Sequence, residues 1–298
     1  MNSQFTLSCC STVDLPYAHL VQRQVPVLFY TYVVDGQEYV DDMGRDPEAL
    51  PRFYRFLQEG KLPQTSQVNV ATYVEVFEQQ LQKGDLLHIA FTSGQSGSVN
   101  NAYIAAEMLR EKYPERKIQV IDSLCSSSGY GLLVDEAADL RDAGRSLEET
   151  AQWVLANRNK VHHQFFSSDM TQFRRTGRVS GAAAMVATVL NICPIMRLND
   201  EGRIIAYDKV RGKKKAVAVT VENMLQHAQN GTDYAERCYS CNSDCPEDAK
   251  LLTDAIGEKF PNLRGKIVQC DIGTIIGSHA GKGTVAVFFM GDERPHME

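Results

Sequence analysis

Short apolar segments alternate with amphipathic ones through the first half of the chain. The apolar segments are rich in Val, Ile, Leu and Phe and predict buried strands. They lie at residues 5–9, 25–34, 85–91 and 117–122. Between them, apolar residues recur at helical spacing, as over residues 70–81 behind the N-cap candidate Asn69. Strands that alternate with helices imply parallel crossovers, so we predict an α/β domain over residues 1–160, with a parallel sheet between two layers of helices.

The pattern changes after a helical segment that begins at Ser146. A run of small residues at 178–190 predicts a helix, and the polar turn at 199–202 between two strand-like runs is typical of a hairpin. We therefore predict an α+β domain with a mixed sheet over residues 161–298. Its predicted strands lie at 161–169, 194–198, 203–210, 234–240, 266–272 and 284–290, with helices at about 212–229 and 246–260.

Composition and charge exclude several classes of protein. Of 298 residues, 43% are hydrophobic and 23% charged, and 31 Lys plus Arg against 37 Asp plus Glu give a net charge of -6. This is the balance of a folded globular protein, not of a disordered or nucleic-acid-binding one. No apolar run reaches the ~18 to 20 residues of a membrane span. The first residues lack the basic region of a signal peptide, so we expect a cytoplasmic protein.

Eight cysteines and two adjacent histidines raise the question of disulfides and metal sites. The cysteines are few for the length and several lie in strand-like runs, which favours buried, reduced thiols. The spacing of Cys238, Cys241 and Cys245 is that of half a zinc site. Cys238 and Cys241 lie in a predicted strand, however, where their odd separation points the two side chains to opposite faces. His162 and His163 lie on a predicted strand, where we expect one to face the core and one to face away. We expect no metal site.

Four segments rich in glycine and hydroxyl residues interrupt the apolar pattern, and α/β proteins place their sites in such segments. One of them precedes a helix that opens near Val99, and a helix N-terminus favours an anion such as a phosphate or a carboxylate. Another fails as a phosphate loop, because Gly283 stands where Ser or Thr would hold magnesium. The four segments are residues 10–16, 62–67, 91–98 and 273–283.

Two further features concern catalysis and charge. Ser96 lies in the string GQSGS, which is close to a nucleophile elbow, although the second glycine comes one position early. A serine-dependent acyl hydrolase that uses Ser96 and His279 is therefore the alternative function. Arg and Lys concentrate at residues 174–178 and 211–215 of an otherwise acidic chain. Arg178, just before the run of small residues, is placed to reach an anion or an acidic partner.

Seven strings follow one another along the chain and cover nearly all of it. They are STVDLP, LPQTSQ, FTSGQSGSVNNA, VIDSLCSSSGYGLLV, RRTGRVSGAAAMVATVLNICPIM, VRGKKKA and IGSHAGKG. Each alone is weak, but in this order and spacing they closely resemble the DegV family. Members of that family are bacterial proteins that bind one fatty acid and serve as the carrier subunit of fatty acid kinase.

The resemblance implies a two-domain DegV-like fold with an apolar tunnel between the domains. One long-chain fatty acid would lie in that tunnel, with its carboxylate near the mouth. The family pattern implies that Thr65 and His279 hydrogen-bond the carboxylate, together with Ser93 or Ser96. It leaves open which of the two serines makes the contact.

The resemblance also implies a carrier and not an enzyme. Phosphorylation of a carboxylate needs a nucleotide site, and the sequence has no nucleotide motif, so an ATP-dependent fatty acid kinase would supply the chemistry. Arg178 and Arg211 are assigned by resemblance to the head-group mouth or to the kinase-docking surface. The fatty acid is the expected ligand, with no cofactor, no nucleic acid, and at most transient contact with a membrane. Two positions depart from the family pattern: Cys10 stands where Asp is common, and Val68 where Pro is common.

Simple energetics favours a closed tunnel over a surface groove. Burying about fourteen methylenes at ~0.8 kcal/mol each contributes on the order of 11 kcal/mol, and association costs roughly 4 to 15 kcal/mol. Only a dry and largely preformed pocket leaves useful affinity. A carboxylate in such a pocket needs donors, which hydroxyl groups such as that of Thr65 supply. A regulatory protein that binds another apolar carboxylate is a third interpretation, and the sequence does not specify the length of the acyl chain.

Overall fold

The computed structural model describes residues 5–180 and 191–296. The first sheet has four strands in the order β2-β1-β6-β7, and every pair is parallel. The parallel sheet predicted for the first half is confirmed. Its strands are β1 (Phe5–Cys10), β2 (Val27–Leu28), β6 (Asp85–Ala90) and β7 (Ile118–Asp122).

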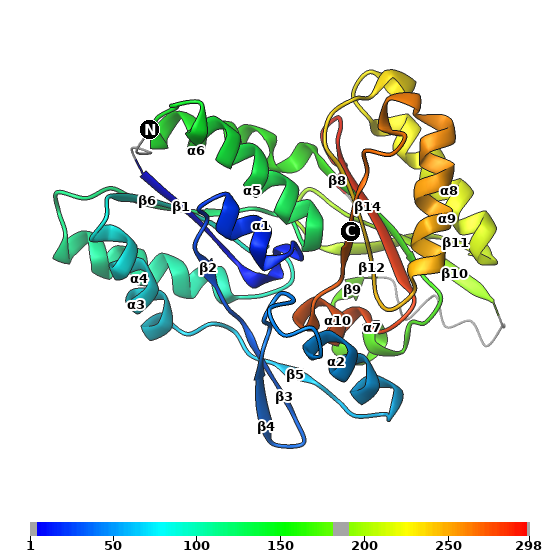
Figure 1. Cartoon of the computed structure of the whole chain (residues 1–298), viewed down its shortest axis with the longest axis horizontal. Helices are drawn as coiled ribbons and strands as arrows, with labels where there is room; N and C mark the ends of the chain where they lie inside the picture. The colour runs from blue at the N-terminus through cyan, green and yellow to red at the C-terminus, as the bar shows by residue number, and fades with distance from the viewer. Residues whose placement is uncertain (1–4, 181–190, 297–298) are drawn as a thin grey trace.

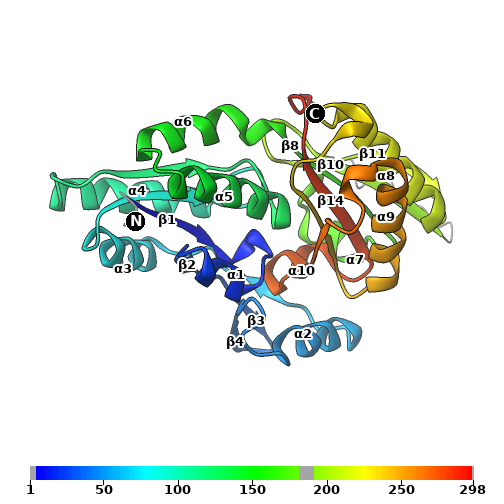
Figure 2. The same ribbon diagram turned by 45° about the horizontal axis from the view of Figure 1, so that its top comes forward.

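Helices cover both faces of this sheet, which gives the predicted three layers (Figure 2). α3 and α4 pack together on one face, and α5 and α6 pack together on the other. Asn69 caps α3 by accepting a hydrogen bond from the backbone N–H of Thr72 at 2.9 Å, and Ser146 caps α6 in a capping box with Glu149. The helices are α1 (Tyr17–Gln22), α3 (Val70–Leu81), α4 (Ser98–Lys112), α5 (Ser127–Asp142) and α6 (Leu147–Asn157).

A small second sheet, with strand order β4-β3-β5, was not predicted. The apolar run at 25–34, expected as one strand, is divided, because the hydroxyl of Ser11 accepts the backbone N–H of Tyr30 at 3.2 Å and pairing with β1 ends there. Asp35 and Gly36 then form a hairpin turn with positive φ angles of 51° and 81°. The elements of this unit are β3 (Thr31–Val34), β4 (Gln37–Val40), β5 (Gln64–Thr65) and the neighbouring α2 (Ala49–Gln58).

The second half forms a seven-stranded sheet in the order β13-β12-β14-β8-β10-β11-β9, with α8 and α9 along one side (Figure 1). Two of its strand pairs are parallel and four antiparallel, which confirms the mixed sheet. The turn at 199–202 joins β10 and β11 in the predicted hairpin. The strands are β8 (Val161–Ser167), β9 (Val179–Ser180), β10 (Ile192–Leu198), β11 (Ile204–Arg211), β12 (Cys238–Asn242), β13 (Val268–Asp271) and β14 (Thr284–Met290).

Two predictions for the second half need correction. Val179 and Ser180 form strand β9 beside β11, so the predicted helix does not begin there, and its residues 181–190 lie outside the described residues. His162 and His163 are both only 2% exposed, so the expectation that one faces away from the core is wrong. The physical reason is that α8 packs on one face of β8 and α5 on the other.

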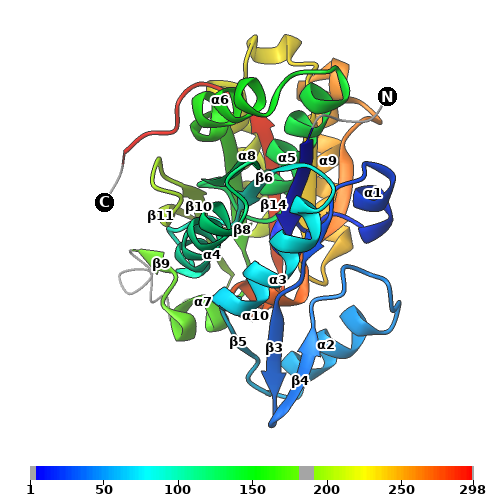
Figure 3. The ribbon, with the colours of Figure 1, turned by 90° about the vertical axis from the view of Figure 1, so that its left-hand side faces the viewer.

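Of the helices in the second half, α7 and α10 are short, whereas α8 and α9 are long. α7 and α10 pack against each other, and α10 lies next to the small sheet and α2 at one end of the molecule (Figure 3). No helix within residues 5–180 and 191–296 is long and apolar enough to cross a membrane. The helices are α7 (Thr171–Thr176), α8 (Lys213–His227), α9 (Pro246–Lys259) and α10 (Thr274–Ala280), with 3-10 turns at Ser11–Val13, Arg158–Lys160, Gly231–Asp233 and Pro261–Leu263.

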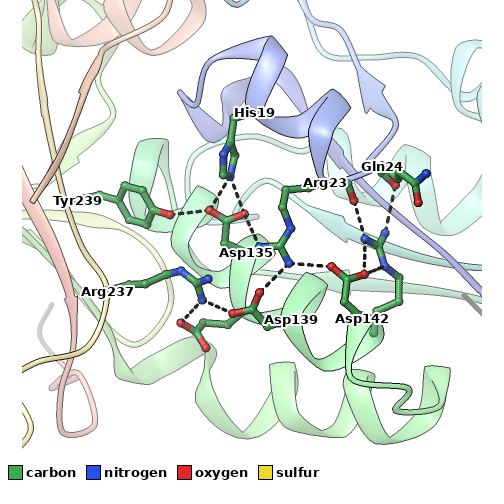
Figure 4. A network of polar contacts seen from close by, with 10 residues as sticks. His19, Arg23, Gln24, Asp135, Asp139, Asp142, Arg237 and Tyr239 are labelled. Atoms are coloured by element: carbon green, nitrogen blue, oxygen red, sulfur yellow. Dashed lines mark hydrogen bonds and ion pairs between the residues drawn. The ribbon is translucent and has the colours of Figure 1, made fainter. Parts of the chain in front are cut away.

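Helix α5 belongs to the first half of the sequence but packs against both large sheets, on β1 and on β8, β12 and β14. Its acidic residues also join the halves through polar contacts (Figure 4). Asp135 accepts a hydrogen bond from the Tyr239 hydroxyl at 2.5 Å, and Arg237 lies 2.7 Å from Asp139. The two halves therefore share an extensive contact, and the domain boundary between residues 160 and 161 stays a prediction.

Candidate functional site

A cavity of about 480 Å³ lies between the two halves of the chain, and both contribute to its wall. Its volume falls in the range of small-molecule sites, roughly 300 to 1,000 Å³. No Asp or Glu side chain of the described residues lines it, and Arg178 is the lining residue with a permanent charge. The cavity therefore suits an apolar ligand that carries a negative group. The apolar and aromatic lining residues are Tyr30, Phe91, Phe165, Phe173, Leu198, Ile204, Ile272, Ile275, Ile276, Ala280, Ala286 and Phe288.

One face of α10 forms part of this wall. Ile275, Ile276, His279 and Ala280 line the cavity, and their spacing places them on one side of a helix. The opposite side packs on α2, where a Cβ atom at Gly277 would lie 2.8 Å from the ring of Phe53. Close packing against α2 therefore holds the lining face of α10 toward the cavity.

Two buried carboxylates from the first half hold the N-terminus of α10. The backbone N–H of Gly273 donates to Asp14 Oδ1 at 3.0 Å, and the N–H and hydroxyl of Thr274 donate to Asp41 Oδ1 at 3.1 and 2.8 Å. Burial raises the pKa of both carboxyl groups, and these hydrogen bonds oppose that rise. Asp14 and Asp41 thus fix the helix that carries His279, although sequence reasoning assigned them no role.

Thr65 and His279, which the family resemblance assigns to the carboxylate, meet in the wall of the cavity, and that assignment stays a prediction. Thr65 comes from β5 and His279 from α10, and Thr65 Oγ1 lies 2.9 Å from His279 Nε2. Burial, followed by the charge of Arg178, lowers the pKa of His279 to about 4, so the ring is neutral at pH 7. With its proton on Nε2 the ring donates to Thr65, which leaves the Thr65 hydroxyl proton available to an anion.

Ser93 and Ser96 line the same cavity, on the loop that precedes α4. The hairpin turn of the second half packs directly on this loop: a Cβ atom at Gly94 would lie 2.6 Å from the backbone of Gly202. Gln95 Nε2 also donates to the Gly202 carbonyl at 3.2 Å. The close approach requires glycine at position 94, and it fixes the loop against the opposite wall of the cavity.

The two predicted arginines differ in position. Arg178 lines the cavity, and its guanidinium donates to the Thr176 carbonyl at 2.5 Å. Arg211 ends β11, is exposed, and lies outside the cavity lining within the described residues. Arg178 thus belongs to the cavity wall and Arg211 to the exposed surface, and their assignment to the head group or to a kinase stays a prediction.

His163 lines the cavity too, although the sequence indicated only ordinary packing for it. Its Nε2 accepts the backbone N–H of Ser126 at 3.1 Å, so the ring proton lies on Nδ1, which donates to the Val161 carbonyl at 3.0 Å. Burial lowers the pKa of His163 well below its usual value, and the ring is neutral. Ser126 and Ser127, which also line the cavity, lie in one of the seven family strings, but no site role was predicted for them or for His163.

Both departures from the family pattern fall in the core of the first half. Cys10 Sγ lies 3.7 Å from His88 Nε2 and 3.8 Å from the Tyr73 hydroxyl, and burial raises the pKa of this thiol to about 11. The carbonyl of Val68 accepts a hydrogen bond from Asn101 at 2.8 Å. Neither side chain lines the cavity. None of the eight cysteines forms a disulfide in the described structure and seven of them are buried, and their reduced state stays a prediction.

A nucleophile and its base are not paired in this cavity. The described partner of His279 Nε2 is Thr65, and Ser96 Oγ accepts the backbone N–H of Ser98 at 3.3 Å. His279 Nδ1 is buried without a partner among the described residues, so no carboxylate orients the ring. A serine hydrolase needs both contacts, and the geometry therefore favours binding over hydrolysis.

Comparisons with known proteins agree on the family. A family model described as "Uncharacterised protein, DegV family COG1307" matches residues 10–292. A DegV domain-containing protein of Clostridium perfringens is 37% identical over 98% of this chain and 99% of its own length. A similar protein of Lactococcus lactis is 32% identical over 95% of this chain and 96% of its own length.

Solved structures share the fold over nearly the whole chain. A DegV family protein from Thermus thermophilus, whose structure is described as fatty acid binding, has a TM-score of 0.84, with 26% identity over 97% of this chain and 99% of that chain. The fatty acid kinase B3 protein of Streptococcus pneumoniae, loaded with linoleic acid, has a TM-score of 0.81, with 23% identity over 97% of this chain and 100% of that chain. The family match, the two-domain α/β fold and the order of the seven sequence strings agree with one another. This chain belongs to the DegV family.

Proposed function

We propose that this protein encloses one long-chain fatty acid and presents its carboxylate to an ATP-dependent fatty acid kinase, after which it carries the acyl phosphate. The observation that carries the proposal is the largely apolar cavity between the halves, which has neutral donors and Arg178 in its wall and no carboxylate among its described lining residues. The relatives that bind fatty acids support it, since they share the fold across the chain. The acyl chain takes the apolar wall and the carboxylate takes the polar one.

The polar wall suits a carboxylate for a physical reason. An anion taken out of water needs hydrogen bonds, and neutral donors give them without a second buried charge to desolvate. In the proposal Thr65 donates to the carboxylate and is itself held by His279, at 2.9 Å. Ser93 or Ser96 donates from the opposite loop, and Arg178 adds a charge-assisted contact at the mouth.

The kinase role rests on exposed basic residues of the second half of the chain. Arg178 and Arg211 are exposed cations, and Lys213 to Lys215 follow in the chain. A negatively charged kinase surface would pair with them, while the kinase supplies ATP and magnesium. The proposal places the protein in the cytoplasm, where such a kinase has its nucleotide, with transient contact with a membrane to collect the fatty acid.

A titration of lipid-stripped protein with palmitate or oleate tests the binding site. Thr65→Val should weaken binding roughly 10- to 100-fold, because one buried hydrogen bond to a charged group is worth about 1.5 to 3 kcal/mol. Thr72→Val is the matched control, since it removes a hydroxyl from α3 outside the cavity lining. Equal affinity of Thr65→Val and the control would remove Thr65 from the site.

A second assay separates the carrier role from simple binding. With ATP and a fatty acid kinase, hydroxylamine trapping should detect acyl phosphate only when this protein carries the fatty acid. Arg211→Ala should slow that reaction without a change in affinity, because Arg211 lies outside the cavity lining, whereas Arg178→Ala should alter both. Stoichiometric labelling of Ser96 by a fluorophosphonate would instead support the hydrolase and contradict the carrier.

A further inference from the structure

Three potential metal ligands meet on the side of β8 that faces away from the cavity. His162 and His163 are neighbours on β8 and point to opposite faces, so that His163 lines the cavity and His162 points toward α8. His227 is the last residue of α8, and Asp292 follows β14. His227 and Asp292 are 65 residues apart in the chain and His162 and Asp292 are 130 apart, so only the fold brings the three together.

The donor atoms of these three residues converge. Asp292 Oδ1 lies 3.0 Å from His162 Nε2 and 3.0 Å from His227 Nδ1, and all three ligand atoms lie within 4.8 Å of one another. Imidazole nitrogens bind zinc at ~2.0 to 2.1 Å, so two of them on one ion lie at most about 4.2 Å apart. In the tetrahedral geometry of zinc two such nitrogens lie only about 3.4 Å apart, so donor atoms that now lie up to 4.8 Å apart must approach by about 1.4 Å through side-chain rotation.

The surrounding residues keep the three ligands close together, and the His227 ring must turn out of its stack on His162 before both nitrogens can point at one ion. The His162 ring is stacked on Phe289, with centroids 5.1 Å apart, and on His227, with centroids 4.8 Å apart. The backbone N–H of Asp292 donates to the His227 carbonyl at 3.1 Å. Gly291 permits this approach, because a Cβ atom there would lie 2.4 Å from the His227 carbonyl oxygen and 2.7 Å from the His162 ring. Asp292 is 60% exposed, which leaves a side open to water.

We propose that His162, His227 and Asp292 bind one divalent first-row transition cation, with zinc as the first to test, and that water completes the coordination. Two imidazoles and one carboxylate are a ligand set that zinc accepts. No metal site was predicted from the sequence, because neither the cysteines nor the adjacent His162 and His163 have a ligand partner at a local spacing, and the three ligands proposed here are far apart in the chain. The inference does not depend on the proposed function, since none of its ligands lines the cavity.

The cation would fasten the C-terminal segment to the rest of the protein. Arg294 follows Asp292 by two residues and is 3% exposed, and it donates to the carbonyls of Leu124 at 2.8 Å and Val161 at 3.2 Å. Leu124 belongs to the first half and Val161 to the second. A cation at Asp292 would therefore hold in place the arginine that joins the two halves.

The test is a zinc titration of full-length protein treated with a chelator, followed by calorimetry and by the absorption of cobalt(II) as a substitute ion. We expect saturable binding of one ion per chain, and a rise in melting temperature with zinc. His227→Ala and Asp292→Asn should each weaken binding at least about tenfold. His296→Ala is the matched control, because His296 forms a similar exposed pair with Asp200, at 3.0 Å, without a third ligand of this set.

The variant series decides the outcome. Stoichiometric binding that both variants weaken and the control retains supports the site. Asp292→Asn changes an exposed side chain and keeps its shape, so its circular dichroism should match that of the wild type. Wild-type protein that shows no saturable binding below about 100 μM zinc, or affinity unchanged in both variants, would overturn the proposal.

Discussion

The two halves of the chain meet in two regions of opposite character. At the cavity the facing groups are neutral: hydroxyls, two uncharged histidines and apolar side chains, with Arg178 alone as a permanent charge in the described lining. Along α5 the facing groups are ions, with Asp135, Asp139 and Arg237 in one network (Figure 4). The charges along α5 are satisfied by partners within the protein, whereas the hydrogen-bond donors of the cavity wall stay available to a ligand.

The contrast follows from the cost of burying charge. A carboxylate in the cavity wall would repel a fatty acid, and an unpaired one would be protonated. Along α5 the carboxylates have partners: Asp135 accepts from His19 at 2.8 Å as well as from Tyr239. Charge pairs there set how the halves fit together, and the neutral cavity sets what they enclose.

The largest effect should come from removing the centre of the ion network. Asp135 is 1% exposed, so Asp135→Ala leaves the Tyr239 hydroxyl and His19 without their acceptor. The free energy of unfolding should fall by about 3 kcal/mol, as is usual when one partner of a buried pair is removed. Urea denaturation measures it. A loss no larger than that of an exposed acid of the same network, such as Asp142→Ala, would show that the network does not join the halves.

A fall in pH should destabilise the protein through His279, a neutral residue of the cavity wall. Its pKa of about 4 in the folded protein is below the ~6.5 of an unfolded histidine, so the unfolded chain binds more protons between these values. Stability is therefore lost as pH falls from about 7 toward 4. His279→Gln should reduce the loss between pH 7 and pH 5 by on the order of 1 to 2 kcal/mol. Parallel curves for the two proteins would mean that His279 is not held neutral.

A smaller effect should distinguish the two serines of the cavity loop. Ser96 Oγ accepts the backbone N–H of Ser98 at the start of α4, so Ser96→Ala should cost about 1 kcal/mol of stability. Ser93→Ala should leave stability unchanged, because that side chain is exposed. Titration with fatty acid then shows which serine contacts the carboxylate. Unchanged affinity in both variants would leave this loop outside the binding site.

The smallest effect should come from the exposed edge of the ion network. Asp139 is 47% exposed and pairs with Arg23 and Arg237, both at 2.7 Å. Burial raises the pKa of Asp139, but the two arginines lower it by more, so the pKa lies below its usual value. The charge of Asp139 therefore stabilises the protein at pH values above the usual pKa of an aspartate. Asp139→Asn should cost less than about 1 kcal/mol, and less still in 1 M salt. A loss of stability that does not depend on salt would show that Asp139 and its arginines behave as a buried ion pair.

The spacing of apolar and turn residues predicted those elements whose sequence has one clear pattern. Helix α3 spans Val70–Leu81 as predicted from its apolar spacing, and the hairpin at 199–202 follows its turn residues. The small sheet was missed, since its strands are two to four residues long, although Asp35-Gly36 is itself a hairpin signal. The two buried histidines of β8 were misread because alternation cannot show a strand covered on both faces.

The candidate site could be predicted only where a family resemblance connected distant residues. Thr65 and His279 are 214 residues apart, and no local pattern predicts their contact. Asp14 and Asp41, which hold α10, were assigned no role, although Asp14 lies in the candidate segment 10–16, because single acidic residues in a loop are usually solvated. Side chains that act through the packing of two halves become visible only once the packing is known.

The most direct test of the central claim is a native mass spectrum of the purified protein, followed by organic extraction of its ligand. If the cavity between the halves encloses a fatty acid, the spectrum should show one added long-chain fatty acid per chain, and acid extraction should release it. The same protein after delipidation should take up one equivalent of added oleate. A folded protein that carries no lipid and takes up no oleate would contradict the account.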